Sequence, residues 1–497
     1  MDLRNFSRLV LLIVFFEIFS SAEAQPPINY DFNNRDDISP GYPDSGIKPY
    51  YWNNGLLFLG FCTDSSQNNY GMTLTFEDTI GNIIWRKITF LPAYPKMEGT
   101  AIVSYNNSGF YVSGMVATSA SQYKLFFAKF DNNGDSLFYK IFSDSTSNLA
   151  EDMIVFSADT LLVLCNWKVH DTDEYNRHII YRMDTLGIMI SSDSSILVAG
   201  RPAYQIMRGV NNRIYVGGTY KTAPGNNYYV KIFIDVYDDN LNELATWHPS
   251  NTLNEYFSQL NLLNNEIYLT SAVTAYNPPN TNPFFQFRIG KLNLSGTYQT
   301  YQNFGPLDFN PGGGKTRVVN QNCLAVPIRY SGNDGIYFVD SSCNVLCNAD
   351  IGYPLVYTEY SDIIVTPSQK IAGTGYAYNF PYNPANTQDH WNFLTEPVEI
   401  FLSTNCGVGV HELSSSSGIT VYPIPNNGQM TVGLNGKNYS AIHVFTTLGE
   451  EVYSLELDPN KQDQQLDILL ANAAEGLYII QVISKEGITS KKVLISK

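Results

Sequence analysis

Runs of hydrophobic residues, each following a short polar turn, recur along most of the chain. The runs are rich in Leu, Ile, Val, Phe and Tyr, which pack well on a pleated surface, so each run predicts a strand. Seven such runs lie at residues 55–60, 109–114, 159–164, 212–218, 265–269, 322–326 and 369–373. The pattern therefore predicts one strand-rich unit repeated along the chain.

A second motif lies inside the units, where a further apolar run ends in Asp-x-x-Gly. An Asp side chain can hydrogen-bond its own backbone and Gly supplies a positive φ, so the motif predicts a hairpin between neighbouring strands. Full copies begin at Asp78, Asp131 and Asp184, and weaker copies begin at Asp238, Asn293 and Asp340. The spacings are 53, 53, 54, 55 and 47 residues. A period near fifty with several strands per unit is typical of a β-propeller.

The seventh unit is incomplete, because residues 398–406 lead directly into the C-terminal tail. Residues 26–54 precede the first complete unit and would supply the missing strands, which closes the ring without an exposed edge. We therefore predict an all-β chain with a seven-bladed propeller at residues 25–406. Six or eight blades remain as alternatives, because one degenerate unit would change the count. The repeat length is similar to that of kelch-like propellers, but their glycine-pair and tryptophan signatures are missing.

The N-terminus has the pattern of a signal peptide. Arg4 and Arg8 precede the apolar run 9–16, and Ala22-Glu23-Ala24 stands before Gln25. Signal peptidases accept this small-x-small form, so we expect residues 1–24 to direct Sec export into the periplasm and to be removed. A spanning helix needs about 20 apolar residues, and no later stretch reaches that length, so we expect no transmembrane segment in the mature chain.

The tail is predicted to be a separate small domain. A Ser- and Gly-rich stretch at residues 407–417 reads as a flexible linker. Short alternating runs separated by turns then predict a small immunoglobulin-like β-sandwich at residues 418–497. These runs lie at residues 430–432, 442–445, 466–469, 477–483 and 491–495.

Short motifs in the tail carry a family resemblance. The motif residues are Tyr422, Pro423, Pro425, Gly428, Gly449, Gly476, Tyr478, Lys491 and Lys492. Their layout resembles the type A C-terminal sorting domain of the type IX secretion system, with Ile424 where the family usually has Asn in Tyr-Pro-Asn-Pro. The resemblance implies a Bacteroidetes-type cargo that the type IX machinery carries across the outer membrane. Such a cargo is then secreted or anchored at the cell surface.

The charge balance narrows the range of partners. The formal net charge is −16, although only 15% of residues are charged. Nucleic-acid binding depends on Lys and Arg neutralising phosphates, so we expect no nucleic-acid partner. Docking on anionic lipid is disfavoured for the same reason. We interpret the excess of acids as a solubilising surface.

No catalytic or cofactor motif is found. The six His residues lack the His-Glu-x-x-His spacing, and no Gly-x-Ser-x-Gly elbow occurs. The Asp131–Asp135 segment resembles a calcium loop, but Gly comes fourth rather than sixth and Phe142 occupies the twelfth place, so we interpret it as a turn. We predict no cofactor, and calcium stays open as an alternative that no full motif supports. Residues 311–316 end in Gly-Lys-Thr without phosphate-loop spacing and are interpreted as an inter-blade loop.

An aromatic and Asn-rich stretch is the candidate ligand-binding surface. Aromatic faces beside amide groups are the features on which sugars stack and bond. The candidates are Tyr376, Tyr378, Tyr382 and Trp391 in the seventh unit and Tyr276 in the fifth. Packing and turn formation explain these residues equally well.

Six cysteines allow 15 disulfide pairings in an exported chain. Cys62 and Cys165 lie in apolar runs and are expected to be buried thiols. We expect disulfides among Cys323, Cys343, Cys347 and Cys406.

Two classes of function are compatible with these observations. In the first, the chain is a non-catalytic surface or secreted protein whose propeller binds a glycan or a protein. In the second, it is an extracellular hydrolase or lyase whose carboxylates converge at the central channel, where distant blades would leave no sequence motif. A channel lined by apolar side chains would rule out the second class.

Overall fold

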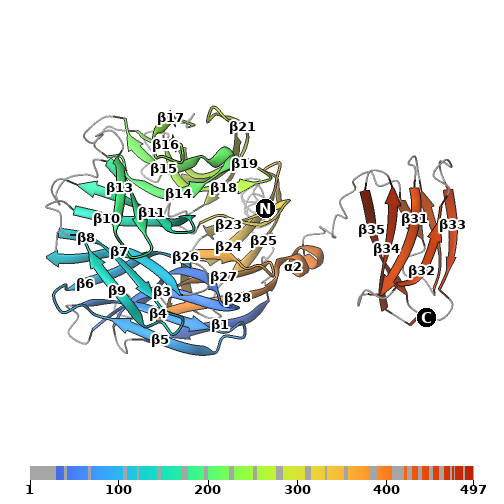
Figure 1. The fold of residues 1–497 in the computed structure, drawn as a ribbon, viewed down its shortest axis with the longest axis horizontal. Coiled ribbons are helices and arrows are strands. Elements are labelled where there is room, and N and C mark those ends of the chain that lie inside the picture. The colour runs from blue at the N-terminus through green and yellow to red at the C-terminus, as the bar shows by residue number, and fades with distance from the viewer. Residues whose placement is uncertain are drawn as a thin grey trace, which may run out of the picture. The chain divides into compact units, whose positions relative to one another are not determined.

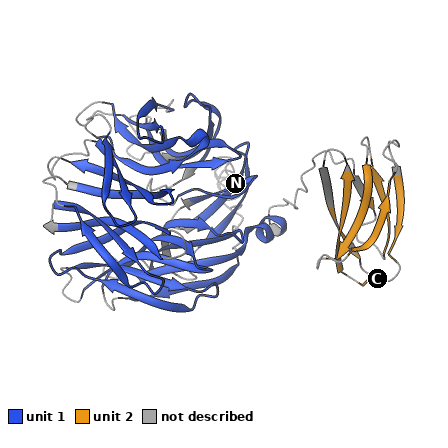
Figure 2. Cartoon of the chain, viewed as in Figure 1, with its two compact units in different colours: residues 1–407 blue, residues 408–497 orange. Residues whose placement is uncertain are grey.

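The computed structural model describes two compact units, residues 1–407 and 408–497, which are treated separately below (Figures 1 and 2). The described residues are 29–495 apart from 39–41, 65–68, 105–108, 120–121, 143–146, 169–176, 195–199, 223–228, 250–253, 276–283, 308–314, 331–332, 352–355, 380–388, 406–418, 423–427, 435–438, 447–450, 458–463, 471–472, 475 and 485–486. The expected signal peptide and linker lie outside the described residues. No described helix is long and apolar enough to span a membrane.

The described strands of the first unit form seven four-stranded antiparallel blades, which confirms the predicted propeller. The first strand of each blade contacts the first strand of the next, and the seventh contacts the first, so these strands form the inner ring. One parallel pair, Tyr70 with Lys96, also joins the sheets of blades 1 and 2.

Blades 1 to 4 follow one another along the chain. Blade 1 has β2 (Asp44–Trp52), β3 (Gly55–Thr63), β4 (Tyr70–Glu77) and β5 (Ile83–Thr89). Blade 2 has β6 (Lys96–Ser104), β7 (Phe110–Ser119), β8 (Gln122–Phe130) and β9 (Ser136–Ile141). Blade 3 has β10 (Ser147–Ser157), β11 (Thr160–Lys168), β12 (Arg177–Asp184) and β13 (Met189–Ser194). Blade 4 has β14 (Ala203–Arg208), the 3-10 turn η1 (Val210–Asn212), β15 (Ile214–Lys221), β16 (Val230–Tyr237) and β17 (Glu243–Trp247).

Blades 5 to 7 complete the ring. Blade 5 has β18 (Asn254–Leu263), β19 (Glu266–Ala275), β20 (Phe284–Leu292) and β21 (Tyr298–Leu307). Blade 6 has β22 (Arg317–Asn320), β23 (Cys323–Tyr330), β24 (Asn333–Asp340) and β25 (Val345–Ile351). Blade 7 has β26 (Val356–Val365), β27 (Lys370–Asn379), β28 (Asp389–Pro397) and, from the N-terminal segment, β1 (Tyr30–Asp36).

The N-terminal segment closes the ring as the sequence predicted. Strand β1 pairs with β28 as the fourth strand of blade 7, and β2 becomes the inner strand of blade 1. The two ends of the propeller are thereby held in one sheet. After β28 the chain forms a short helix, α2 (Val398–Asn405), in a chain that was predicted to be all-β.

The Asp-x-x-Gly motif forms the turn between the third and fourth strands of blades 1 to 6. In blade 1, Oδ1 of Asp78 accepts the backbone N–H groups of Ile80 and Asn82 at 3.0 and 2.8 Å, and Gly81 has φ 85°. The weaker copies keep this geometry, because Leu241 and Cys343 also have positive φ and are buried at the glycine position. Blade 7 lacks the turn because its fourth strand comes from the other end of the chain.

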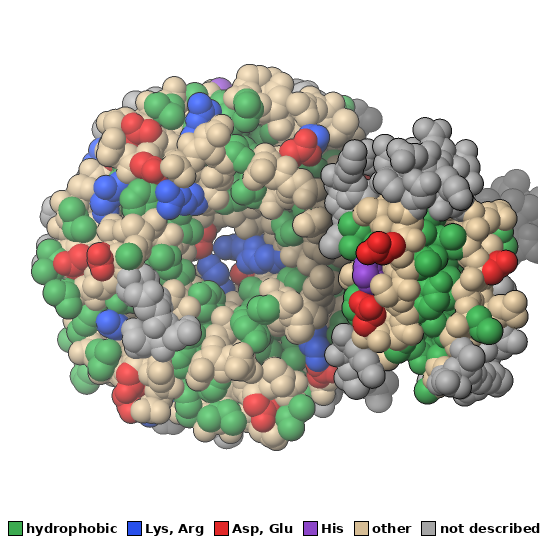
Figure 3. Space-filling view, turned by 45° about the vertical axis from the view of Figure 1, so that its right-hand side comes forward, with side chains coloured by type: hydrophobic (Ala, Val, Ile, Leu, Met, Phe, Trp, Pro, Cys, Tyr) green, Lys and Arg blue, Asp and Glu red, His purple; other side chains and the backbone are tan. Residues whose placement is uncertain are grey.

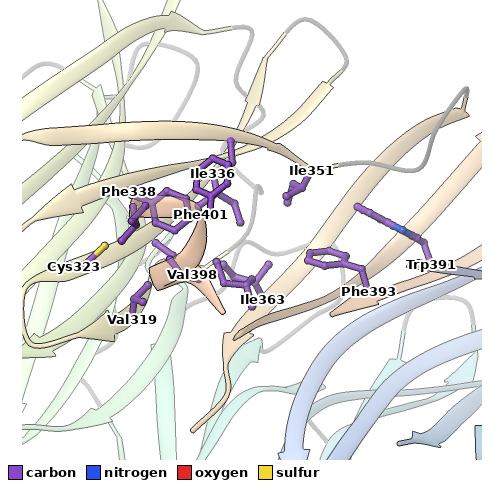
Figure 4. Close-up of a cluster of buried hydrophobic side chains, with 14 of the residues drawn as sticks. Val319, Cys323, Ile336, Phe338, Ile351, Ile363, Trp391, Phe393, Val398 and Phe401 are labelled. Atoms are coloured by element: carbon purple, nitrogen blue, oxygen red, sulfur yellow. The ribbon is translucent and has the colours of Figure 1, made fainter. Parts of the chain in front are cut away.

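Hydrophobic side chains fill the spaces between neighbouring blades. Figure 4 shows the cluster around blades 6 and 7, where Phe338 and Ile363 meet Val398 and Phe401 of α2. Helix α2 therefore belongs to the propeller core. Val398, Phe401 and Leu402 cover the seam between blades 6 and 7, which explains why these residues are apolar although they add no strand.

The second unit is a sandwich of two antiparallel sheets, as the tail pattern predicted. One sheet contains β29 (Ile419–Tyr422), β30 (Gln429–Leu434) and β33 (Gln464–Leu469). The other contains β31 (Tyr439–Thr446), β32 (Glu451–Glu456), β34 (Gly476–Ser484) and β35 (Gly487–Ile495). Buried residues of both sheets, such as Val432 and Ile480, form one core, which is the packing of immunoglobulin-like domains.

Candidate functional site in the central channel

β-Bulges interrupt the inner strands of the propeller at matching places. In six blades the inner strand contains one extra residue that has no partner in the register with the second strand. These extra residues are Ile47, Thr100, Glu151, Tyr204, Ser258 and Ser361. A bulge re-aims the side chains next to it and is frequent beside functional sites. The bulged positions carry unlike side chains, although the backbone irregularity recurs at matching places.

Polar side chains next to the bulges connect one inner strand to another. Gln205 of blade 4 donates to the carbonyl oxygen of Leu260 in blade 5 at 3.0 Å and accepts the Leu260 N–H at 2.6 Å. Arg317 of blade 6 donates to both carboxylate oxygens of Asp362 in blade 7, at 2.9 and 3.0 Å, and to the Ile363 carbonyl at 2.8 Å. These contacts hold neighbouring blades together around the channel.

One ion pair joins blades that are not neighbours. Nζ of Lys48 in blade 1 lies 2.8 Å from Oδ1 of Asp152 in blade 3. The other oxygen of Asp152 accepts the N–H of Ile206 in blade 4 at 3.2 Å. A side chain can skip a blade in this way only near the axis of the ring. Figure 3 shows a central opening in this unit in which Lys and Arg side chains gather with carboxylates beside them.

The carboxyl groups of Glu151 and Asp152 differ in their protonation behaviour. Removal from water raises the pKa of Glu151 to about 7, although Asn166 donates to it at 2.8 Å and Lys315 lies nearby. Burial also acts to raise the pKa of Asp152, but Lys48, Lys315 and the Ile206 N–H outweigh it and hold that pKa below its usual range. Near neutral pH the channel thus contains one carboxyl group that exchanges its proton and one that stays ionised.

Lys315 completes the charged group. It stands shortly before β22 and is half-buried, and burial together with repulsion by Lys48 lowers its pKa. Its field reaches Asp152 of blade 3 and Asp362 of blade 7. The channel is therefore lined by charged groups from blades 1, 3, 6 and 7 and is not apolar.

The aromatic candidates do not form a described binding surface. Trp391 is buried, its Nε1 donates to Asn33 at 2.7 Å, and its ring lies 4.9 Å from that of Phe393, so the prediction that it contacts a ligand is wrong. It packs inside the blade 6 and 7 cluster (Figure 4). Tyr376 is half-buried in β27. Tyr276, Tyr382 and the side chain of Tyr378 lie outside the described residues.

The cysteines are arranged differently from the prediction. Cys323 and Cys343 are buried thiols, so the expectation that they form disulfides is wrong. They cannot meet, because Cys323 packs in the core between blades 6 and 7 and Cys343 in the core between blades 5 and 6. Cys347 is disulfide-bonded, and Cys406 lies outside the described residues. Cys62 and Cys165 are buried thiols, as expected.

Other polar groups are buried within the blades. His178 lies 3.0 Å from the hydroxyl of Tyr237 and 3.6 Å from Asp235. Both carboxylate oxygens of Asp235 accept from Nη2 of Arg201. Burial and Arg201 lower the pKa of His178 to about 3, so the ring is neutral and does not pair as a cation. The acidic residues that the sequence places near it, at 171–174, lie outside the described residues. Within the described ranges, no cluster of three or more potential metal ligands occurs.

The tail motif residues are mostly structural in the described sandwich. Gly428 has φ 98° and its carbonyl accepts the Leu470 N–H at 2.7 Å, and Gly476 has φ 150° at the start of β34. Tyr478 is buried and donates to the Ala474 carbonyl at 3.0 Å. Tyr422 ends β29 with 46% exposure. In β35, Lys491 and Lys492 pair with Ile480 and Ile479, whereas Pro423, Pro425 and Gly449 lie outside the described residues.

The channel residues were missed because the sequence pattern emphasised the second strand of each blade. A usable signal was present: a charged or amide residue followed by apolar residues. It occurs as Asp152-Met153-Ile154, Gln205-Ile206-Met207, Gln259-Leu260, Arg317-Val318-Val319 and Asp362-Ile363-Ile364. Within these inner strands apolar residues such as Met153, Ile206, Leu260, Val319 and Ile363 enter the cores. Asp152, Gln205, Arg317 and Asp362 instead contact other blades.

Comparison with protein families identifies the second unit. Residues 420–496 match the family model Por_Secre_tail, described as a secretion system C-terminal sorting domain. This segment is a C-terminal sorting domain, which confirms the resemblance found in the sequence. A type IX sorting tail implies export to the cell surface or secretion. The search of curated proteins found no match.

Solved structures similar to the chain are distant in sequence. The β-propeller domain of the Trilobed protease from Pyrococcus furiosus is 9% identical, with a TM-score of 0.42 over 70% of this chain and 93% of that chain. An acylaminoacyl peptidase of Pyrococcus horikoshii is 10% identical, with a TM-score of 0.43 over 80% of this chain and 59% of that chain. The GH93 alpha-L-arabinofuranosidase of Fusarium graminearum is 10% identical, with a TM-score of 0.40 over 74% of this chain and 97% of that chain.

Proposed function

We propose that the protein is a type IX secretion cargo, delivered to the cell surface or the medium, whose propeller binds an extracellular glycan or protein in its central channel without catalysis. Convergence of charged groups from four blades in the central opening carries this proposal. We further propose that residues 1–24 are the signal peptide, 25–406 the propeller, 407–417 the linker and 418–497 the sorting domain.

The engagement of the channel carboxylates favours binding over catalysis. Asp152 is held by Lys48 and by a backbone N–H, and Asp362 by Arg317 and the Ile363 N–H. Hydrolysis of a glycosidic bond usually needs two carboxyl groups that act on the substrate as acid and as base or nucleophile. Carboxylates that already hold the inner ring together are poorly placed for that work.

The test is a ligand screen with a channel-blocking variant. The mature chain, 25–497, is applied to a glycan array with and without calcium and to a panel of extracellular proteins, and saturable binding is expected. Ser258→Trp places a large side chain at a bulge in the inner ring and should abolish the binding. Ser191→Trp on the exposed fourth strand of blade 3 is the matched control and should bind normally. Binding that survives Ser258→Trp would place the ligand elsewhere.

An enzyme is the second candidate, because Glu151 and Asp152 have pKa values displaced in opposite directions. Such a pair can supply a proton donor and an ionised partner. A hydrolase would release reducing ends from an extracellular polysaccharide, and a lyase would form an unsaturated product. Either activity should be lost in Glu151→Gln while binding is retained. Turnover that is equal in wild type and Glu151→Gln would exclude this site as its source.

Delivery has its own test. Deletion of residues 418–497 should leave the protein in the periplasm, because the sorting domain lies in this segment. Cell fractionation followed by immunoblotting measures the result. Unchanged export of the truncated chain would refute the role of the tail.

A further inference from the structure

The cations of the channel differ in whether an anionic partner lies in direct contact with them. Lys48 is paired with Asp152 at 2.8 Å. Arg317 is occupied by Asp362, by the Ile363 carbonyl and, at 3.2 Å, by the Thr316 carbonyl. Lys315 differs from both: no carboxylate of the described residues lies within 4.0 Å of its ammonium group.

Lys315 nevertheless stands among strong charges in a partly enclosed place. Lys48 and Arg317 repel its ammonium group, whereas Asp152 and Asp362 attract it from farther away. Burial without a direct partner is costly for a charged side chain. A ligand that brings a negative charge to Lys315 would remove this cost. Figure 3 shows that the propeller has a central opening in which Lys and Arg side chains gather.

We propose that Lys315 is the anchor for a singly charged oxyanion group of the extracellular ligand: the carboxylate of an acidic sugar or the sulfate ester of a sulfated one. This inference rests on the proposed binding function. An ammonium group offers three N–H donors to such a group, and Lys48 stands beside it as a second cation.

The surrounding groups select against a higher charge. The carboxylates of Asp152 and Asp362 lie next to the site, each engaged by a cation, so a phosphate dianion would meet more repulsion than a single negative charge. Glu151 adds a further selective group, because its protonated form donates a hydrogen bond to a ligand oxygen. The site should therefore bind a carboxylate or a sulfate ester more tightly than phosphate. It should also bind a carboxylate or a sulfate ester more tightly than a neutral sugar.

Calorimetric titration of the mature chain tests the inference. The probes are an oligogalacturonate, a sulfated galactose oligomer, a neutral galactose oligomer of the same length and inorganic phosphate. We expect one or both acidic oligomers to bind at least roughly tenfold more tightly than the neutral one, since a charge-assisted hydrogen bond contributes about 1.5–3 kcal/mol. The stronger of the two acidic probes identifies the source of the oxyanion.

Two matched variants locate the effect. Lys315→Met keeps the length of the side chain and removes its charge, and it should lower acidic binding by roughly tenfold or more without changing neutral binding. Lys87→Met makes the same change at an exposed lysine that pairs with Asp135 away from the channel, and it should change nothing. Thermal unfolding of both variants checks that they fold.

The outcomes distinguish failure of the Lys315 inference from failure of the proposed ligand binding in the channel. Equal acidic binding by wild type and Lys315→Met, or preference for the neutral oligomer or phosphate, would overturn the role of Lys315. If the channel-dependent ligand of the array is neutral or a protein, the binding function stands and the oxyanion inference fails. If Ser258→Trp changes no binding at all, the channel function itself fails.

Discussion

The outer turns, which join the third and fourth strands of a blade, and the bulges of the inner strands both recur from blade to blade. The turns repeat their side-chain chemistry, whereas the bulges repeat only their backbone conformation. In the turns between third and fourth strands, the chemistry recurs: Asp131 of blade 2 accepts the N–H groups of Asn133 and Asp135, as Asp78 does in blade 1 with its own neighbours. At the inner bulges the backbone recurs, but the extra residue changes from Thr100 to Glu151 to the aromatic Tyr204.

This difference separates structural from functional repetition within one molecule. A turn that must reverse the chain needs the same acceptor and the same positive φ each time. A bulge only needs its backbone shape, so its side chain is free to serve contacts that differ around the ring. Variation at a position of constant geometry is therefore the feature that points to the channel.

The largest expected effect is a steric change at an outer turn. At Gly296, φ is 78° and a Cβ would lie 2.2 Å from Cγ of Trp247, so Gly296→Ala should cost about 3 kcal/mol through left-handed strain and overpacking. Gly187→Ala is the control, because φ is 70° but the nearest atom is 3.0 Å away, and it should cost about 1 kcal/mol. Chemical denaturation measures both. Equal costs would mean that φ alone governs the turns.

Next in size is the loss of a channel ion pair. Asp362→Asn leaves Arg317 with a neutral partner in a mostly buried place, and we expect a loss of about 2 kcal/mol of unfolding free energy. Asp135→Asn breaks the Lys87 pair at an outer turn, where the Asp135 side chain is 64% exposed, and should cost at most about 0.5 kcal/mol. Similar losses of unfolding free energy in both variants would mean that ion pairs in the channel stabilise the fold no more than those at the outer turns.

Two buried acids should make stability depend on pH. Removal from water raises the pKa of Glu77, beside the first outer turn, and of Glu151, in the channel, to about 7 from 4.5. The folded state keeps protons that the unfolded state releases, so stability is full below pH 4.5 and falls as pH rises to about 7. At about 1.4 kcal/mol per pKa unit, at most roughly 3 kcal/mol per group is expected. Denaturation across this range should show a smaller slope for Glu77→Gln than for Glu399→Gln on the exposed side of α2; equal slopes would contradict the assignment.

The smallest effect should come from the acceptor of an outer turn. Asp131→Ala removes hydrogen bonds to two backbone N–H groups that water can replace, so we expect a loss of about 1 kcal/mol. Ligand binding in the channel should not change. The control is Asn133→Ala, whose exposed side chain lies in the same turn. A change in ligand affinity for Asp131→Ala would show that the outer turns also take part in ligand binding.

The blade pattern was predictable because it is local. A run of apolar residues, an Asp acceptor and a glycine act within a few residues, so Asp78, Asp131 and Asp184 revealed the period directly. The sorting domain was predictable for a related reason, since its motifs stand in a fixed order in the tail. Trp391 shows the limit: an aromatic residue reads alike on a surface and in a core, and only the packing against Phe393 and Asn33 distinguishes them.

The sequence by itself determined the repeat and the address in the tail, because these follow from motifs that are near in the chain or fixed in order. It also determined the closure, because the incomplete seventh unit needs strands that only the N-terminal segment is left to supply. The tertiary structure alone decided the channel. Lys48, Asp152 and Lys315 are separated by 104 and 163 residues, and no local pattern relates their charges. They meet because the closed ring brings its inner strands to one axis, where burial and mutual charge then set which groups are paired and which remain available to a ligand.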